Sequence, residues 1–146
     1  MNKLKIYTDG SCDNKTKIGG WGFVMLANEH VLEVNGNKNK TTSNRMELMA
    51  VLKSLSMVTK PSAIEVVTDS QYVVKGINSN GYEHQGDDFL NSDLWIKVRR
   101  QLDKHYVKVK WVRGHSGDYY NEKADKLANR SRISLVNFLD RLKGRG

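Results

Sequence analysis

The chain has 146 residues, of which 38% are hydrophobic and 27% are charged, so it can bury a core of single-domain size. No apolar run approaches the roughly 20 residues that cross a bilayer, and residues 1–6 contain no hydrophobic block of signal-peptide length. A cytoplasmic protein without a membrane partner is therefore expected. Cys12 is the only cysteine, which excludes an internal disulfide and a thiolate metal cage, so any metal must be held by oxygen or imidazole.

The charge is unevenly distributed along the chain. Lys and Arg number 24 against 16 Asp and Glu, a formal net charge of +8, which favours polyanionic partners. Residues 97–113 hold seven basic side chains and one acidic one, whereas residues 76–96 hold four acidic side chains and no Lys or Arg. The basic stretch is therefore the candidate contact surface, with a solvated helix face as the alternative.

The first half of the chain predicts three strands and a helix. Residues 4–8 alternate with period two and meet the turn signal Asp9-Gly10-Ser11, which indicates a strand. Residues 21–27 and 31–35 predict two more strands joined by a polar turn, hence an antiparallel meander. Residues 44–58 have apolar side chains at helical spacing, and the helix should end before Pro61.

The second half alternates strand and helix. Residues 64–68 are rich in β-branched side chains and predict a strand, after which Asp69-Ser70 should cap a helix through Ile77. Ser92-Asp93 should cap a helix through Leu102, and residues 107–111 alternate as a last strand. A helix is expected over residues 121–128 and a separate amphipathic helix from Ile133 onward. One mixed α/β domain over residues 1–146 follows.

Four carboxylates fall at ends of these elements: Asp9 after the first strand, Glu47 in the first turn of the first helix, Asp69 after the fourth strand and Asp125 in the helix after the last strand. If the first and fourth strands are parallel neighbours, Asp9 and Asp69 emerge together. Charges so close repel one another, so the cluster requires raised pKa values or hard divalent cations.

Each of these acids also has an ordinary structural interpretation. Asp9-Gly10 is a common turn pair, Asn44 with Glu47 resembles a capping box, and Asp69 could simply start a helix, while Asp125 could lie on a solvated helix face. His115 follows the last strand among small residues close in sequence to Asp125, which makes it the candidate catalytic imidazole or a surface histidine. The other histidines fall in sequences typical of polar turns: His30, His84 and His105.

Five segments, residues 7–12, 44–50, 68–73, 111–117 and 121–128, together resemble the type 1 ribonuclease H family. The resemblance implies the ribonuclease H-like α/β fold: a five-stranded mixed sheet, an antiparallel three-strand meander plus two parallel strands, flanked by helices. It also implies an endoribonuclease that hydrolyses the RNA strand of RNA/DNA hybrids by two-metal-ion catalysis, giving 5′-phosphate and 3′-hydroxyl ends. A monomer whose partner is the RNA/DNA hybrid is expected.

The resemblance also implies residue roles. Asp9, Glu47, Asp69 and Asp125 would hold two Mg²⁺ ions, with Mn²⁺ as a possible substitute, and His115 would be a mobile proton shuttle. One ion would lower the pKa of the attacking water and the other would stabilise the leaving oxygen. The residues expected to contact the hybrid are Lys15, Thr42, Ser43, Asn44, Ser70 and Gln71.

Three departures from the family pattern affect substrate binding. Residues 13–17 replace a common Gly-Asn-Pro-Gly loop, and Ser43 stands where many members have an asparagine. Residues 78–89 are not basic, whereas many bacterial members have a Lys- and Trp-rich handle there. Binding should therefore depend on residues 97–113 and on basic side chains of the tail: Arg130, Arg132, Arg141, Lys143 and Arg145.

Two other functions are compatible with the same fold. One is a hybrid-binding or partner-binding module that has lost catalysis, against which the intact carboxylates and His115 argue. The other is a different nuclease, such as a resolvase or integrase core, against which Gln71 and the Gly114-His115 pair argue. Trp95 and Trp111 occur at core-like spacing, so packing is expected for both rather than base stacking.

Overall fold

The computed structural model describes residues 1–78 and 90–144. Residues 79–89, which include nearly all of the segment expected to replace the basic handle, lie outside the described part. The elements in chain order are β1 (Asn2–Cys12), β2 (Gly19–Ala27), β3 (His30–Lys38), α1 (Ser43–Ser56), β4 (Ser62–Thr68), α2 (Gln71–Asn78), α4 (Ser92–Leu102), β5 (Tyr106–Trp111) and α5 (Tyr119–Gly144).

The five strands form one mixed sheet in the order β3-β2-β1-β4-β5. β1, β2 and β3 are antiparallel neighbours, whereas β4 is parallel to both β1 and β5. The turn between β2 and β3 has Asn28 at a φ of 56°, a conformation that asparagine tolerates better than most residues. The predicted meander, the two parallel strands and the fold class are confirmed.

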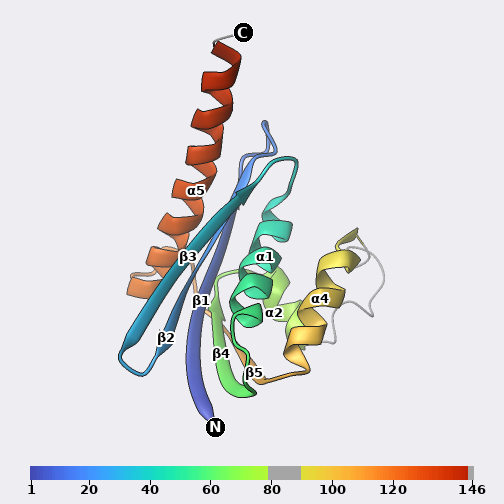
Figure 1. Ribbon diagram of the computed structural model, residues 1–146, viewed down its shortest axis with the longest axis vertical. Coiled ribbons are helices and arrows are strands. Elements are labelled where there is room, and N and C mark those ends of the chain that lie inside the picture. The colour runs from blue at the N-terminus through green and yellow to red at the C-terminus, as the bar shows by residue number, and fades with distance from the viewer. Residues whose placement is uncertain (79–89, 145–146) are drawn as a thin grey trace.

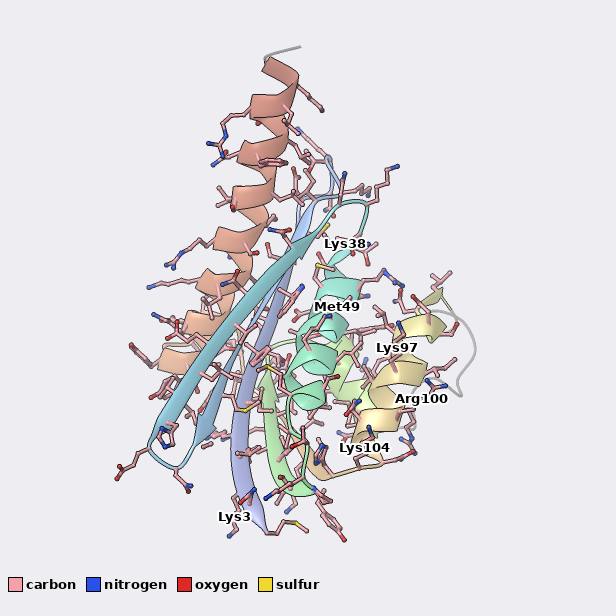
Figure 2. All side chains as sticks on the ribbon, viewed as in Figure 1. Lys3, Lys38, Met49, Lys97, Arg100 and Lys104 are labelled. Atoms are coloured by element: carbon pink, nitrogen blue, oxygen red, sulfur yellow. The ribbon has the colours of Figure 1, made fainter. Side chains whose placement is uncertain are left out.

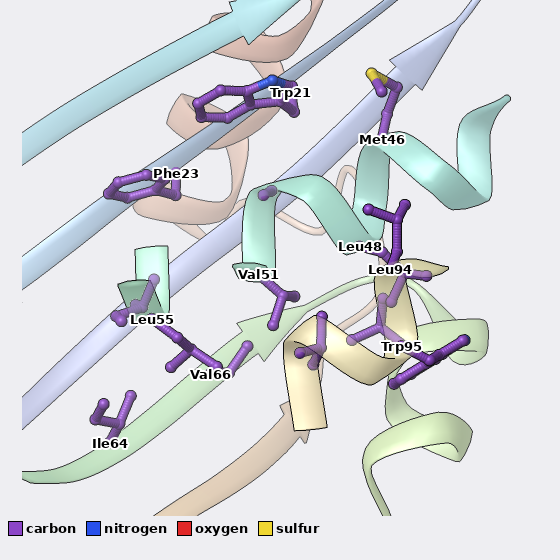
Figure 3. Packing of buried hydrophobic residues seen from close by; sticks show 14 of the residues in the cluster. Trp21, Phe23, Met46, Leu48, Val51, Leu55, Ile64, Val66, Leu94 and Trp95 are labelled. Carbon is purple, nitrogen blue, oxygen red and sulfur yellow. The ribbon is translucent and has the colours of Figure 1, made fainter. Parts of the chain in front are cut away.

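Helices cover both faces of the sheet, with α1, α2 and α4 on one side and α5 on the other (Figure 1). The alternation of strand side chains divides the core accordingly. Ile6 and Val66 pack into the cluster beneath α1, α2 and α4, whereas Tyr7 and Val67 pack with Leu127 of α5. Figure 3 shows the larger cluster, in which side chains of α1 and α4 meet those of the central strands.

Trp95 and Gly76 fix the contact between α4 and α2. The Trp95 side chain is 1% exposed, and its Nε1 donates a hydrogen bond to the Tyr72 hydroxyl at 2.9 Å. A Cβ on Gly76 would overlap the indole ring of Trp95, so glycine at this point of α2 allows the two helices to approach. The expectation that Trp95 packs in the core is confirmed.

α5 is one continuous helix of 26 residues, so the predicted separation into two helices is wrong. Residues 129–132 contain neither proline nor glycine, and the helix stays bound to the sheet there because Asn37 Nδ2 donates to the Ser131 carbonyl oxygen at 3.1 Å. Beyond this contact α5 projects past the end of the sheet (Figure 1). Its apolar side chains there include Phe138 and Leu142, which are 52% and 58% exposed.

Of three helix starts, two differ from expectation and one agrees with it. α1 is capped by Thr42, whose Oγ1 accepts from the Arg45 N–H at 3.2 Å, so the capping box of Asn44 with Glu47 is wrong. Ser70 caps α2 as predicted, accepting from the Val73 N–H at 3.2 Å. Ser92 lies within the first turn of α4 instead of capping it, and no side chain of the described residues caps that helix.

His105 and Trp111 are also placed differently from expectation. His105 is buried instead of lying in an exposed polar turn, and its Nδ1 accepts from the Ser62 N–H at 3.2 Å. Trp111 is 43% exposed, so it is not a core residue. Its Nε1 donates to the Asp69 carbonyl oxygen at 3.1 Å, which ties the end of β5 to the residue that follows β4.

Candidate active site

Asp9 and Asp69 meet where β1 and β4 cease to be paired. β1 is longer than predicted, because it pairs with β2 as far as Cys12, so Asp9 lies inside a strand rather than after it. The parallel pairing with β4, however, ends at Tyr7 opposite Val67. Asp69 directly follows β4, so the two carboxylates lie at the edge where parallel strands present ligand sites.

Glu47 completes the group from α1. One carboxylate oxygen from each of Asp9, Glu47 and Asp69 lies within 4.8 Å of the others. The close approach of α1 to β1 depends on Gly10, because a Cβ on that residue would overlap the Glu47 backbone nitrogen. Gly10 thus serves helix packing, whereas the sequence indicated only a turn.

The three carboxylates are held in an environment that disfavours three negative charges. Burial, followed by the charges of Asp69 and Asp125, raises the pKa of Asp9 to about 9, although the Gly10 N–H donates to its Oδ1 at 2.9 Å. Burial and the charges of Asp9 and Asp69 raise the pKa of Glu47 well above its usual range. Burial and then Asp125 raise that of Asp69.

Glu47 adds a second sign that the group is incomplete without a cation. Its Oε1 is buried and has no hydrogen-bond partner among residues 1–78 and 90–144. An unpaired carboxylate oxygen costs free energy, and a hard divalent cation with oxygen ligands would remove that cost. The donor set of three carboxylates therefore fits Mg²⁺ or Mn²⁺.

Asp125 approaches the group from α5 without belonging to its tightest part. It is absent from the set of oxygens within 4.8 Å, yet its charge raises the pKa of both Asp9 and Asp69. Its Oδ1 accepts from Asn129 Nδ2 at 3.2 Å. Asn129 did not emerge from the sequence, although its position four residues after Asp125 places both on one helix face.

His115 lies on the loop after β5, on the side of Asp69. It is exposed and has a φ of 58°, in the left-handed region that few non-glycine residues adopt. The preceding Gly114 passes close to Asp69, because a Cβ there would lie 2.9 Å from Asp69 Oδ2. The charge of His115 acts to lower the pKa of Asp69, which places the imidazole near the carboxylates.

The residues expected to contact substrate lie at the starts of α1 and α2 and in the loop before β2. Thr42, Ser43 and Asn44 are exposed at the start of α1, one turn before Glu47. Gln71 is exposed directly after Ser70, whose own hydroxyl is buried as the cap of α2. Lys15 is exposed in the loop between β1 and β2.

An ion pair joins the start of α1 to the start of α4. Arg45 donates from Nη1 and Nη2 to the two carboxylate oxygens of Asp93, at 2.9 and 2.7 Å. This bidentate pair lowers the pKa of Asp93 to about 2. α4 and its basic side chains are therefore held beside the exposed residues 42–44.

The basic stretch of residues 97–113 is divided between the two faces of the sheet, so it is not one surface. Lys97 and Arg100 of α4 and Lys104 just after it (Figure 2) line a groove of about 580 Å³ between α1 and α4. On β5, Lys108 and Lys110 are exposed and alternate with Val107 and Val109, which face the core beneath α4. The two lysines of β5 thus belong to the face that α5 occupies.

A five-stranded mixed sheet with carboxylates where its central parallel strands cease to be paired is the architecture of a ribonuclease H-like nuclease. The family model for RNase H matches residues 1–133. The Ribonuclease H of Thiobacillus denitrificans is 41% identical over 134 residues, covering 86% of this chain and 90% of that protein. The Ribonuclease H of Cupriavidus metallidurans is 41% identical over 143 residues, covering 92% of this chain and 99% of that protein. The chain belongs to the ribonuclease H family of nuclease enzymes.

Solved structures agree on the fold. LC9-RNase H1, a type 1 RNase H with the type 2 active-site motif, superimposes with a TM-score of 0.78 at 24% identity, over 92% of this chain and 74% of that one. The N-terminal RNase H domain of a Mycobacterium tuberculosis protein gives the same TM-score at 22% identity, over 95% and 99% of the two chains.

Among the described residues, no helix is long and apolar enough to span a membrane.

Proposed function

We propose that the protein is an endoribonuclease that hydrolyses the RNA strand of RNA/DNA hybrids and leaves 5′-phosphate and 3′-hydroxyl ends. The observation that carries this proposal is the group of Asp9, Glu47 and Asp69, with oxygens within 4.8 Å, in a chain of the ribonuclease H family. The enzyme would act as a cytoplasmic monomer without a membrane partner.

Asp9, Glu47 and Asp69, with Asp125 beside them, would hold two Mg²⁺ ions, for which Mn²⁺ could substitute. When bound, the ions would lower the pKa of the attacking water and stabilise the leaving 3′ oxygen. The chain's own contribution is to hold the oxygen ligands close together where β1 and β4 cease to be paired and to desolvate them. Repulsion among these groups in the protein without metal makes cation binding more favourable.

His115 would move a proton during the reaction. Its exposed position on a loop beside Asp69 allows the imidazole to reach both the carboxylate group and bulk solvent. An imidazole can accept a proton from water or donate one to the departing strand.

Recognition of the hybrid would come from contacts with its backbone. Thr42, Ser43 and Asn44 would contact the phosphates of one strand, Ser70 and Gln71 would contact the groove, and Lys15 would contact a further phosphate. The 2′-hydroxyl distinguishes RNA from DNA, and only one strand of a hybrid carries it. Such contacts read shape rather than base sequence.

The test is cleavage of a labelled RNA/DNA hybrid beside matched duplex RNA, duplex DNA and single-stranded RNA, with Mg²⁺ or EDTA. We expect cleavage of the hybrid only, dependent on Mg²⁺ and lost in Asp69→Asn. Cleavage of duplex DNA instead would indicate another nuclease of this fold. Tight hybrid binding without cleavage under Mg²⁺ or Mn²⁺ would indicate a binding module and contradict the proposal.

Replacement of His115 should slow the reaction without abolishing it. We expect His115→Ala to lower kcat for hybrid cleavage by about 10²-fold, because one proton transfer loses its positioned group. The dissociation constant for the hybrid in the presence of Ca²⁺ should stay within about 2-fold. An unchanged kcat would show that His115 is an ordinary surface residue.

The basic residues of α4 and Lys104, which directly follows it, should contribute to affinity for the hybrid. We expect Lys97→Ala, Arg100→Ala and Lys104→Ala combined to reduce the slope of log affinity against log salt by about 0.9 for each phosphate that the variant no longer neutralises. The matched control is Lys108→Ala with Lys110→Ala on the other face of the sheet, which should leave the slope unchanged. Equal effects of the two sets would indicate a general attraction rather than a contact surface on α4.

A further inference from the structure

Asn129 is the centre of a side-chain network that joins β1 to α5. Its Oδ1 accepts from the Ser11 hydroxyl at 2.7 Å and from Arg132 Nη2 at 3.4 Å. Arg132 Nε also donates to Ser11 Oγ at 3.0 Å. Asn129 Nδ2 donates to the carbonyl oxygen of Asp125 at 3.1 Å and to its Oδ1 at 3.2 Å.

The neighbours of Asn129 allow only one orientation of its amide group. A guanidinium has donors and no acceptor, so the amide edge beside Arg132 must be the oxygen. The NH₂ group then faces the carboxylate of Asp125, which accepts hydrogen bonds and donates none when it is ionised. The hydrogen bonds from Ser11 and Arg132 to the amide oxygen of Asn129 therefore fix its NH₂ group as the hydrogen-bond donor to Asp125.

The network restrains Asp125 at one of its two oxygens. The backbone of α5 is already held close to β2, because a Cβ on Gly20 would overlap the Ala128 carbonyl oxygen. Backbone packing does not fix the side-chain rotation of a half-buried aspartate. The bond from Asn129 to Oδ1 supplies that restraint on the carboxylate whose charge acts on Asp9 and Asp69.

We propose that Asn129 is a positioning residue for Asp125: its amide NH₂ fixes the rotation of the fourth carboxylate, and Ser11 and Arg132 fix the amide. This inference rests on the proposed function, in which Asp125 helps to hold the catalytic ions. Ser11 lies two residues after Asp9 on β1, so the network sets the position of Asp125 relative to the strand that carries Asp9.

Asn129→Asp separates positioning from a structural role. The new side chain has the same shape and keeps an acceptor for Ser11 and Arg132, but it replaces the donor beside Asp125 by a carboxylate. A purely structural role predicts that this variant keeps its activity, since the contacts between β1 and α5 persist. Positioning predicts that kcat falls by about 10- to 100-fold, while KM for the hybrid stays within about 2-fold.

A second readout does not depend on cleavage. Mg²⁺ that binds the folded protein raises its melting temperature, and the rise grows with the logarithm of the Mg²⁺ concentration. The Mg²⁺ concentration that gives one fixed rise in melting temperature therefore measures the strength of the site. We expect this concentration to increase about 10-fold in Asn129→Asp. Asn137→Ala, an asparagine replacement at an exposed position of the same helix, is the matched control and should match the wild type in both measurements.

A double substitution tests whether Asn129 acts through Asp125. Asn129→Ala should lower kcat in the wild-type background and have no further effect in the Asp125→Asn background. Equal effects in both backgrounds, or full activity of Asn129→Asp with a normal Mg²⁺ response, would overturn the inference while leaving the proposed function intact. Failure of the proposed function would be recognised separately, because the wild type would then not cleave the hybrid.

Discussion

Asp9→Asn is expected to abolish Mg²⁺-dependent cleavage of the hybrid, by at least about 10³-fold, and to stabilise the protein in the absence of metal. The two effects have one cause. Asp9 belongs to the group of three carboxylates within 4.8 Å, so it is needed to hold a cation. Without a cation its charge is buried and repelled, which raises its pKa to about 9.

The raised pKa of Asp9 also predicts the sign of a pH effect. Between about pH 4 and pH 9 the folded protein without metal keeps a proton on Asp9 that the unfolded chain has released. The free energy of unfolding therefore falls as pH rises through this range, and Asp9→Asn should flatten the dependence. Each 1 kcal/mol gained at pH 8 would raise Tm by about 2–4 °C.

The measurement is thermal unfolding in EDTA from pH 5 to pH 9, followed by circular dichroism, beside the cleavage assay with Mg²⁺. Asp140→Asn is the matched control, because it removes the same charge from an exposed position at the projecting end of α5. It should leave the slope of Tm against pH as in the wild type. A large fall in the Tm of Asp9→Asn at pH 8 would show instead that Asp9 stabilises the fold.

Trp95→Ala is expected to cost about 3–5 kcal/mol of unfolding free energy, a large part of the stability of a domain of this size. The indole is buried over Gly76 and its Nε1 donates to Tyr72. Removal would leave a cavity that Gly76, without a side chain, cannot fill, and would take away one of the two hydrogen bonds that the Tyr72 hydroxyl accepts, the other coming from Asn91 Nδ2 at 2.9 Å. Urea unfolding should show a lower midpoint with an unchanged m-value.

Trp95→Phe provides the comparison for the cavity. It keeps most of the apolar volume and removes only the bond to Tyr72, so about 1–2 kcal/mol is expected. Trp111→Ala is the control for tryptophan replacement at a partly exposed position, and its cost should be clearly smaller than that of Trp95→Ala. Equal losses for the two alanine variants would contradict the assignment of Trp95 as the residue that joins α4 to α2.

Much of the sheet could be predicted from the sequence because its strands carry local signals. Alternation in residues 4–8 and β-branched side chains in residues 64–68 are properties of the strands themselves. The end of β1 was misplaced because continued pairing of Asp9 with Gly22 of β2 overrides the local turn signal of Asp9-Gly10. The continuity of α5 was missed for a similar reason: its contact with Asn37 is nonlocal.

The candidate site divides in the same way. Asp9 and Asp69 could be brought together in advance because neighbouring parallel strands present ligand residues at one edge of a sheet, and Glu47 could be expected to reach that edge from a helix. Asn129 could not be found, because its role depends on Ser11, which is 118 residues away. The division of the basic residues 97–113 between two faces of the sheet could not be predicted. The sequence contains no signal that shows on which face α4 packs or toward which face the lysines of β5 point.

The unbroken course of α5 makes the end of the described chain a fixed reference point for the active site. Asp125 and Gly144 belong to the same helix and are separated by about 28 Å along its axis at 1.5 Å per residue. A spectroscopic label on the projecting turns would therefore move with Asp125 as one rigid rod. Distances from such a label to a labelled hybrid would report the orientation of the bound duplex without disturbing any carboxylate of the site.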